Sequence, residues 1–361
     1  MPMFVPGPVD VDPEILAAQS RPTMPHRSKE YEEIFHRAEN NARKLFFTDH
    51  RVIITASSGT GFHEAAVRNF VPDDGRILSL TNGAFGNRWH EVALTNGKTA
   101  DKIETEWNVP VTADLVAEQI TKHKYDILCV VHNETSVGVM NPVKEIAAVV
   151  HELSPDTLIC VDAVSSLGGY KLEMDAWGVD MILTSSQKTL ALPPGLGLAA
   201  VSDRALEKAK TVPNRGWYFD LVRMENYRIK NSTPATSAVN LVYALDVQLL
   251  RILEEGLENR FARYAGMAAR VHAWAEEKGW GLWAPEGYRS MTVTTVNKPE
   301  WLNMSQLNAY LLERDMRVAG GYGPIKPKTF RIAHMGELQM TDMDTLLTTI
   351  DAFEKEVAIA A

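Results

Sequence analysis

Two charged side chains directly follow apolar runs, where an enzyme could use them. Lys188 lies in SSQKTLALPPG, after the run MILT and before a Pro-Pro-Gly break. At a strand end among small residues, a lysine can lose its charge by desolvation and become a nucleophilic amine. Asp162 follows the apolar run TLICV, so its carboxylate needs a partner. A surface lysine and a helix N-cap are the alternative interpretations.

A turn rich in small and hydroxyl residues could bind an anion. The segment ASSGTGFHEAA, residues 56–66, connects a predicted strand to an amphipathic helix. Its backbone N–H groups, its hydroxyls and the positive helix end are all suited to a phosphate. It lacks the third glycine of a dinucleotide fingerprint and the Gly-Lys-Ser/Thr ending of a P-loop. Taken by itself, the segment is equally consistent with a purely structural turn.

A third polar segment, HNETSVGV, follows the apolar strand DILCVV. In an open α/β sheet the ligand lies beyond the carboxyl ends of the strands, so several strands deliver polar residues to one edge. A phosphate site, a buried carboxylate and an activatable lysine on one edge suit pyridoxal phosphate. A lysine forms a Schiff base with this cofactor, and an aspartate keeps its pyridine nitrogen protonated. One common ligand is the economical explanation of all three segments.

The elements that must position these residues follow an α/β pattern between about residues 52 and 202. Runs such as 127–131 are apolar on both faces, which is typical of parallel strands covered by helices. The runs that predict strands are VIIT, RILSL, DILCVVH, TLICVDAV, DMILTSS and LGLAAVS. A large α/β domain is therefore expected.

The flanking segments predict further helices and a smaller α+β unit. In the last predicted helix, Thr341 and Asp344 resemble a capping box. We expect an N-terminal arm over 1–18, a large domain over 19–250 and a small domain over 251–361. The further predicted elements are a helix from Ser28 to Phe46, helices over 237–278, a strand over 291–296, a helix from Ser305 to Leu312, strands in MRVAGGYG and FRIAHMG, and a helix from Thr341.

Composition restricts the function classes. The chain has 361 residues, of which 45% are hydrophobic and 23% charged, as in soluble globular proteins with a sizeable core. A net charge of -9 without a basic run argues against nucleic acid as a partner. No apolar stretch has membrane-spanning length and no signal peptide is evident, so we expect a cytoplasmic protein without membrane contact. Cys129 and Cys160 lie in apolar runs and are expected to be buried thiols rather than metal ligands or nucleophiles.

Motifs along nearly the whole chain resemble the class V aminotransferases of fold type I, in particular the alanine-glyoxylate, serine-glyoxylate and serine-pyruvate aminotransferases. The motifs are FVPGPVDVDP, HRSKE, SGTG, NGAFGNRW, HNETSVGV, VDAVSSLGG, SSQKTLALPPG and FRIAHMG. The resemblance implies a large domain with a mostly parallel sheet, a smaller C-terminal α+β domain and pyridoxal 5'-phosphate as cofactor. It also implies ping-pong transfer of an amino group from alanine or serine to glyoxylate or pyruvate, by a homodimer with a shared active site.

The resemblance also assigns roles to individual residues. It implies that Lys188 is the Schiff-base lysine and proton shuttle, and that Asp162 holds the pyridine nitrogen. Arg331 would bind the substrate α-carboxylate through its planar fork. The other implied cofactor contacts are Ser58, Gly59 and Thr60 at the phosphate, Gln187 beside them, Thr135 near the ring, Phe85 and Val164 on the two ring faces, and Thr233 of the neighbouring subunit at the phosphate.

Some assignments have alternatives. Thr236 is the alternative to Thr233, and Lys230 occupies a position where relatives often have Tyr. No second basic residue near Arg331 is evident for the distal carboxylate of an acidic substrate. Lys326 and Lys328 either face solvent, which is the favoured interpretation, or bind an acidic side chain.

The rival functions are a lyase or decarboxylase of the same fold and a catalytically silent binding subunit. A cysteine desulfurase would need a mobile cysteine near the small domain, and no metal site is expected.

Overall fold

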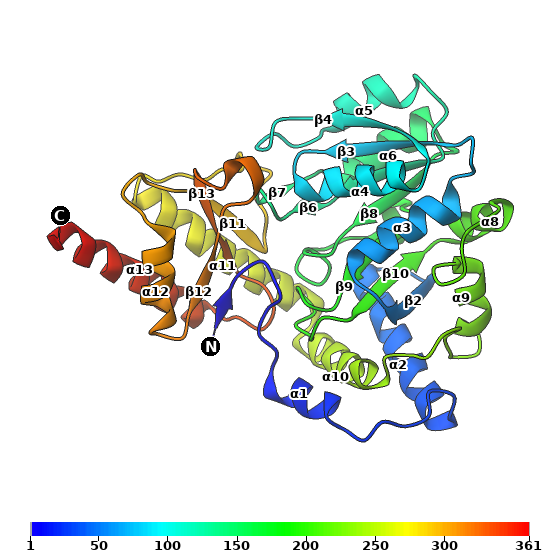
Figure 1. Cartoon of the computed structure of the whole chain (residues 1–361), viewed down its shortest axis with the longest axis horizontal. Coiled ribbons are helices and arrows are strands. Elements are labelled where there is room, and N and C mark those ends of the chain that lie inside the picture. Colours follow the sequence, from blue (N-terminus) through cyan, green and yellow to red (C-terminus); the bar gives the residue numbers. More distant parts are fainter. Residues whose placement is uncertain (1, 361) are drawn as a thin grey trace.

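The computed structural model describes residues 2–360 and contains two main sheets, one in a large α/β unit and one in a smaller C-terminal unit (Figure 1). The large sheet has seven strands in the order β2-β10-β9-β8-β5-β3-β4. All neighbours in it are parallel except β10, which is antiparallel to both β2 and β9. The strands are β2 (Arg51–Ala56), β10 (Leu196–Val201), β9 (Met181–Ser185), β8 (Leu158–Asp162), β5 (Ile127–Val131), β3 (Arg76–Thr81) and β4 (Thr99–Glu104).

The six strands predicted in this region are confirmed, and β4 is the one the sequence did not reveal. The sequence of β4, TADKIE, is largely polar and its residues alternate between exposed and half-buried. An edge strand pairs on one side only and tolerates charged side chains, so it carries no continuous apolar run.

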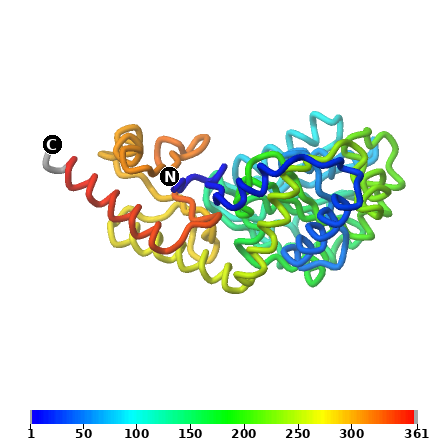
Figure 2. Tube along the Cα trace, turned by 90° about the horizontal axis from the view of Figure 1, so that it is seen from below, coloured from blue at the N-terminus to red at the C-terminus, as the bar shows by residue number. Residues whose placement is uncertain are grey.

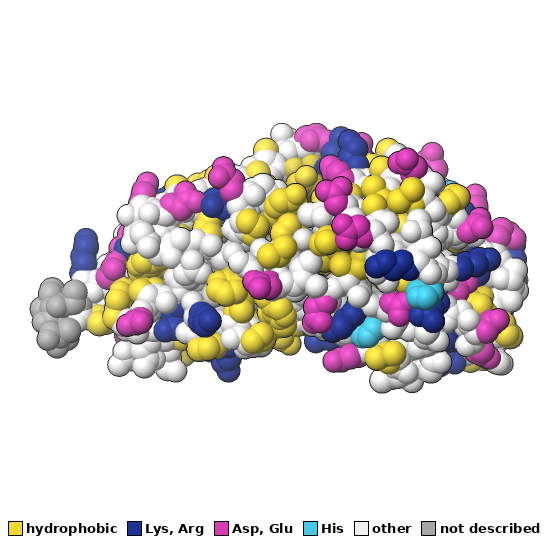
Figure 3. Space-filling model, turned by 90° about the horizontal axis from the view of Figure 1, so that it is seen from above, with side chains coloured by type: hydrophobic (Ala, Val, Ile, Leu, Met, Phe, Trp, Pro, Cys, Tyr) yellow, Lys and Arg dark blue, Asp and Glu magenta, His cyan; other side chains and the backbone are white. Residues whose placement is uncertain are grey.

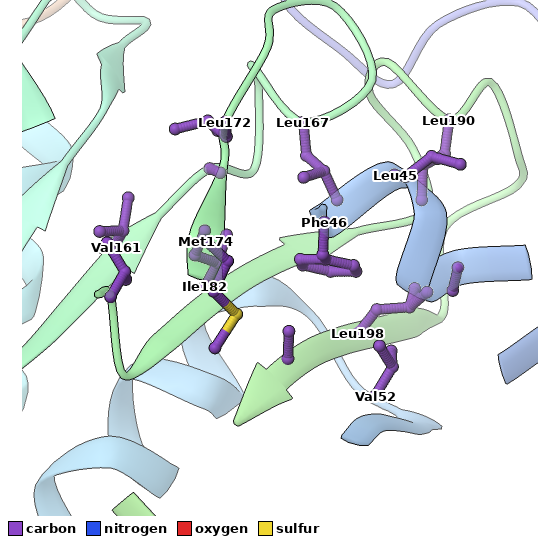
Figure 4. Packing of buried hydrophobic residues seen from close by; sticks show 14 of the residues in the cluster. Leu45, Phe46, Val52, Val161, Leu167, Leu172, Met174, Ile182, Leu190 and Leu198 are labelled. Carbon is purple, nitrogen blue, oxygen red and sulfur yellow. The ribbon is translucent and has the colours of Figure 1, made fainter. Parts of the chain in front are cut away.

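Helices cover both faces of the large sheet, so β5 and β8 are buried throughout. In β5, Leu128 and Val130 face one hydrophobic core, whereas Ile127 and Cys129 face the other. Figure 4 shows Phe46 gathered with Met174, Ile182 and Leu198 in the first core. The helices of this unit are α2 (Lys29–Phe46), α3 (Gly59–Phe70), α4 (Ala84–Thr95), α5 (Ala113–Ile120), α6 (Val143–Leu153), α7 (Met174–Trp177), α8 (Asp203–Thr211), α9 (Leu221–Arg228) and α10 (Val239–Glu255).

Both cysteines are buried free thiols, as predicted. Cys129 of β5 and Cys160 of β8 are register partners on adjacent strands, beneath the helices of the second core. Burial raises the pKa of both thiols well above the ordinary value, because the thiolate would lose its hydration. Neither thiol has the polar, accessible setting of a nucleophile.

The small unit has a four-stranded sheet in the order β1-β12-β13-β11. Its strands are β1 (Met3–Phe4), β12 (Arg317–Gly320), β13 (Thr329–Ala333) and β11 (Val293–Asn297), and its helices are α11 (Leu257–Glu277), α12 (Met304–Leu312), α13 (Met340–Ala360) and the short 3-10 helix η1 (Gly323–Ile325). The Pro- and Gly-rich opening of the sequence suggests an irregular arm, but the arm supplies β1, which pairs in parallel with β12, and helix α1 (Pro13–Gln19). Figure 2 shows this arm running between the two units, and α13 running alongside α11.

Two predicted helix starts need correction. Helix α12 is capped by Asn303 rather than Ser305, and the Asn303 side chain accepts the N–H groups of Ser305 and Gln306. Helix α13 begins at Met340, and its first turn is tied by Asp342, which accepts the N–H of Gln339 at 2.8 Å. Asp344 instead binds Arg270. In both helices a neighbouring polar residue makes the capping bond in place of the predicted one.

Acidic and basic side chains are interspersed over the face in Figure 3, with apolar patches between them. None of the helices within residues 2–360 combines the length and apolar character needed to cross a membrane.

Candidate active site

A cavity of about 270 Å³ lies where the carboxyl ends of β5, β8 and β9 meet. Strand register explains this convergence, because Val131 pairs with Asp162 and Asp162 pairs with Leu183. Nine of the sequence-predicted site residues line the cavity: Ser58, Gly59, Thr60, Phe85, Thr135, Asp162, Val164, Gln187 and Lys188. The other lining residues are His63, Arg88, Val131, Asn133, Ser165 and Ser185. The polar residues that the sequence placed after separate strands therefore share one cavity.

Lys188 lies in the turn after β9 with its amine largely withdrawn from water. Burial is the largest cause that lowers the pKa of Lys188 to about 8; the positive charges of Arg331 and Arg88 act in the same direction, and the charge of Asp162 opposes them. A pKa near 8 leaves a usable share of neutral, nucleophilic amine close to neutral pH. The amine donates a hydrogen bond to the carbonyl oxygen of Pro6.

The reactivity of Lys188 is expected to follow this lowered pKa. Only the deprotonated amine attacks an aldehyde, so the rate at which the cofactor-free protein captures pyridoxal phosphate should rise with pH. With a pKa of about 8, the neutral fraction grows from about one tenth at pH 7 to about nine tenths at pH 9, and then levels off. Stopped-flow absorbance across pH 6.5 to 10 measures this curve. A rate still rising steeply above pH 9 would show an ordinary solvated lysine instead.

The N-terminal arm covers Lys188 closely. Gly7 has a φ of +91°, and a Cβ built on it would lie 2.5 Å from Cδ and 2.8 Å from Nζ of Lys188. The arm is tied down next to this point, because the N–H of Val9 donates to the carbonyl of Gln187 at 3.2 Å. Any side chain at position 7 would therefore compete with the lysine for space.

Substitution of Gly7 by alanine is expected to slow cofactor capture at least tenfold. The added methyl group would push against the Lys188 side chain, and alanine at positive φ adds backbone strain of about 1 kcal/mol. The capture rate and the melting temperature are both measured, with Gly97→Ala as the control, since Gly97 also has positive φ but nothing within 4 Å of its Cβ position. Equal effects of the two substitutions would show that strain, not crowding, is responsible.

Asp162 ends β8 with only 5% of its surface exposed. Its Oδ1 accepts the N–H of Val164 at 2.8 Å, and its Oδ2 lies 2.7 Å from Nε2 of His63. Val164 in turn abuts the backbone of Gly59, where a Cβ would overlap its Cγ2 atom. The carboxylate is thus held in a fixed orientation, and glycine at position 59 keeps helix α3 close to the cavity.

The start of α3 can hold an anion. Ser58 is its N-cap residue but makes no side-chain capping bond, so its hydroxyl does not occupy the N–H groups of the first turn. Among the described residues, the buried Oγ of Ser185 and Oδ1 of Asn133 have no hydrogen-bond partner. Both residues line the cavity, so it contains unused polar atoms as well as a free helix N-terminus. These features fit a phosphorylated, polar cofactor such as pyridoxal phosphate.

Phe85 reaches the cavity from the first turn of α4. The buried carboxylate of Glu134 fixes this turn by accepting the N–H groups of Phe85 and Gly86, each at 3.0 Å. Ser136 donates its N–H and hydroxyl to the same carboxylate. Burial nevertheless raises the pKa of Glu134. Glu134 was not predicted as a site residue, although its place within HNETSVGV was a usable signal.

Arg331 lies near the cavity on β13, with 9% of its surface exposed, but does not line it. Its Nη1 donates to the carbonyl of Thr135 at 3.1 Å and its Nε to that of Gly320 at 3.0 Å. Its guanidinium carbon lies 5.4 Å from the ring centre of Tyr322. Burial lowers the pKa of Arg331. These bonds aim the guanidinium from the small unit toward the large one.

Thr233 does not enter the cavity of its own chain. It borders a small hollow with Thr55 and Pro234, and its hydroxyl donates to the carbonyl of Ala235 at 2.6 Å. The alternatives Lys230 and Thr236 are exposed. The segment thus lies outside the cavity that holds the other predicted contacts.

Arg88 and His63 are cavity residues that sequence reasoning missed. Arg88 follows Phe85 by three residues in NGAFGNRW, which is the spacing of neighbours on one helix face. His63 has the same relation to Thr60 in ASSGTGFHEAA. Helical spacing from a predicted site residue was therefore the available signal for both. In the described part of the chain, no cluster of three or more His, Cys, Asp or Glu side chains could hold a metal ion.

The sequence of this chain is similar to those of known aminotransferases. Residues 14–269 match the family model described as aminotransferase class-V. The L-aspartate–glyoxylate aminotransferase of Paracoccus denitrificans is 34% identical over 93% of this chain and 87% of its own. The serine–glyoxylate aminotransferase of Arabidopsis thaliana is 31% identical over 98% and 90%.

A solved aminotransferase structure has the same fold as this chain. The alanine–glyoxylate aminotransferase of Nostoc sp. superposes with a TM-score of 0.91 and 29% identity, covering 97% of this chain and 94% of that one. The predicted α/β architecture of fold type I is thereby confirmed, as is the resemblance to the alanine- and serine-glyoxylate aminotransferase group. The chain belongs to the class V aminotransferase family and is an aminotransferase.

Proposed function

We propose that this aminotransferase uses pyridoxal 5'-phosphate to move the amino group of alanine or serine to glyoxylate or pyruvate. The observation that carries the proposal is one cavity that combines a largely buried amine, a buried carboxylate and an uncapped helix N-terminus. Lys188, Asp162 and the first turn of α3 match the aldehyde, the pyridine nitrogen and the phosphate of this cofactor. The names of the Arabidopsis and Nostoc relatives support the substrate pair.

The role of each site residue in this chain follows from its position and its charge. The cofactor, when bound, supplies the electron-accepting ring. Nζ of Lys188 would take the proton from Cα of the amino donor and pass it to the cofactor; in the second half of the ping-pong cycle it would carry a proton from the cofactor to Cα of the new amino acid. Asp162 keeps a negative charge opposite the ring nitrogen, and Arg331 holds the substrate α-carboxylate by two parallel hydrogen bonds.

The remaining contacts orient the ring and exclude water. Phe85 and Val164 would enclose the ring, Ser58, Gly59 and Thr60 would hold the phosphate, and Gln187 and Thr135 would contact the cofactor beside them. This enclosure supports proton transfer between fixed groups, because reacting atoms held in one geometry avoid the entropy cost of meeting in solution.

We also propose a homodimer in which Thr233 completes the partner's phosphate site. The position of Thr233 outside its own cavity supports this, as do two exposed apolar side chains: Tyr218, which borders a hollow together with Thr233, and Ile229, four residues before it. Mixing Lys188→Ala with Thr233→Val subunits tests the shared site: if the sites are shared, the hybrid should regain activity that neither parent has.

We propose the cytoplasm as the location of the protein. Its two buried free thiols are compatible with that reducing compartment.

A visible absorption spectrum tests the function directly. The purified protein supplied with pyridoxal phosphate should show a band that Lys188→Ala lacks, that L-alanine or L-serine bleaches, and that glyoxylate or pyruvate restores. Bleaching without restoration by any keto acid would favour a lyase or decarboxylase. A protein that stays colourless would favour a silent subunit.

Arg88 favours a second candidate function, transamination of an acidic donor such as aspartate. Its guanidinium lines the cavity, lies 4.8 Å from the ring centre of Phe85 and forms no ion pair within the described residues. Arg88 and Arg331 both depress the pKa of Lys188, so two cationic forks lie near the reacting amine. A donor with two carboxylates would match both, and the name of the Paracoccus relative supports this donor.

Substitution Arg88→Gln is expected to separate the two candidates. If aspartate is a donor, its kcat/KM should fall about a hundredfold, because a buried carboxylate would lose its charged partner, whereas kcat/KM for alanine should change less than threefold. Lys326→Gln is the matched control, since Lys326 is exposed in the loop before Arg331 and should alter neither donor. Parallel losses for alanine and aspartate would assign Arg88 to the cofactor or the fold.

A further inference from the structure

His63 is a buried histidine that the proposed mechanism leaves without a role. It lies on α3 with 2% of its surface exposed and lines the cavity. Its Nε2 lies 2.7 Å from Oδ2 of Asp162, although 99 residues separate the two along the chain. This bond and the N–H of Val164 are the two hydrogen bonds that Asp162 receives from the described residues through its side chain.

The surroundings of His63 select one protonation state. An ionised carboxylate is only an acceptor, so Nε2 of His63 must carry the shared proton. Nδ1 is buried and has no partner among the described residues. A proton on Nδ1 would leave a buried donor unsatisfied, which is costly. The geometry therefore favours a neutral ring with its proton on Nε2.

The ring of His63 is held in place by Trp89 of α4. The two rings stack with centroids 4.3 Å apart and planes inclined by 11°. The indole Nε1 of Trp89 also donates to the backbone carbonyl of His63 at 3.2 Å. Since α4 carries Phe85 into the cavity by its first turn, the same helix fixes both the ring-facing phenylalanine and the histidine behind Asp162.

We propose that His63 is a positioning residue that orients the Asp162 carboxylate and stabilises its charge for the cofactor's ring nitrogen. The inference rests on the proposed function of Asp162. Without the histidine, Oδ2 of a carboxylate only 5% exposed would lose its donor, and the side chain would be free to turn away from the ring. Hydrogen bonds to charged groups are about twice as strong as neutral ones. Loss of the bond from His63 to Asp162 should therefore also weaken the binding of the cofactor, whose ring nitrogen Asp162 holds.

Two substitutions separate the hydrogen bond from the packing. His63→Gln removes the ring but keeps an N–H donor that reaches Oδ2 of Asp162. His63→Phe keeps a ring that stacks on Trp89 but has no donor. His151→Gln is the control, because His151 on α6 also makes one hydrogen bond, to the carbonyl of Trp177 at 3.2 Å, and does not line the cavity.

Equilibrium dialysis of the cofactor-free proteins against pyridoxal phosphate is the first measurement, and the kinetics of the reloaded enzymes are the second. We expect His63→Phe to weaken cofactor binding and lower kcat about tenfold or more, with KM for the amino donor within threefold of the natural protein. His63→Gln should restore most of both losses, and His151→Gln should behave as the natural protein. Natural-like behaviour of His63→Phe, or equal losses in Phe and Gln variants, would overturn the proposal.

A readout without cofactor or turnover completes the test. Nitrogen-15 NMR of histidine-labelled cofactor-free protein, with the His63 signals assigned by their absence in His63→Gln, should show a protonated Nε2 and an unprotonated Nδ1. A proton on Nδ1 would overturn the proposed bond. If the natural protein itself binds no pyridoxal phosphate, the proposed function fails, whereas normal binding with an unaffected His63→Phe variant refutes only the role of His63.

Discussion

Replacing Lys188 by alanine is expected to lower the transamination turnover by on the order of 10⁴-fold or more, because the change removes both the nucleophile and the proton carrier. Its pKa of about 8 makes Lys188 a reactive amine near neutral pH. Single-turnover kinetics with L-alanine and glyoxylate measure the loss. Because the proton carrier is missing, added methylamine should recover part of the turnover.

Lys171→Ala is the control for this substitution. Lys171 is a half-buried lysine of the large unit whose ion pairs with Glu173 and Glu258 lie at 3.6 and 3.5 Å. Ion pairs that remain accessible to water contribute little to stability, so both activity and melting temperature should stay near those of the natural protein. Turnover of Lys188→Ala within tenfold of the natural protein would remove Lys188 from the chemistry.

The central sheet and the convergence of its loops could be predicted because they depend on local patterns. Buried parallel strands leave runs such as 127–131 that are apolar on both faces. The polar residues that end these runs must meet at one edge once the strands are parallel, which is why Asp162 and Lys188 could be placed together. The polar edge strand β4 carries no such signal.

Contacts between distant segments could not be predicted in the same way. The bond from Lys188 to Pro6 joins residues 182 positions apart, and it depends on how the arm enters the small sheet. The direction of Arg88 into the cavity depends on the rotation of α4, which Glu134 sets through two backbone bonds. Side-chain identity alone does not encode either arrangement.

Replacing Asp162 by asparagine is expected to lower kcat about a hundredfold to a thousandfold while leaving the fold intact. Asparagine keeps an acceptor for the N–H of Val164, and its amide can donate to His63 if the histidine changes tautomer. The negative charge opposite the ring nitrogen is lost, and electrostatic groups of this kind are typically worth two to three orders of magnitude in rate. Steady-state kinetics measure the effect, and KM for the amino donor should move less than threefold.

Asp203→Asn is the matched control for this loss of one carboxylate. Asp203 lies at the start of α8, pairs with Arg51 and is exposed, so its variant should keep full activity. A fall in the melting temperature of Asp162→Asn by more than a few degrees would indicate a structural role instead. Normal activity in Asp162→Asn would contradict its assignment to the ring nitrogen.

Combining Asp162→Asn with His63→Phe distinguishes a shared role from two separate ones. If His63 acts through the carboxylate, its substitution should cost less than a further threefold in kcat once the charge of Asp162 is gone, because there is no charge left to orient. If the two residues act independently, their effects should multiply, as they do for sites that share no partner. The 2.7 Å bond between them predicts the first result, and a fully multiplicative loss would separate His63 from Asp162 in function.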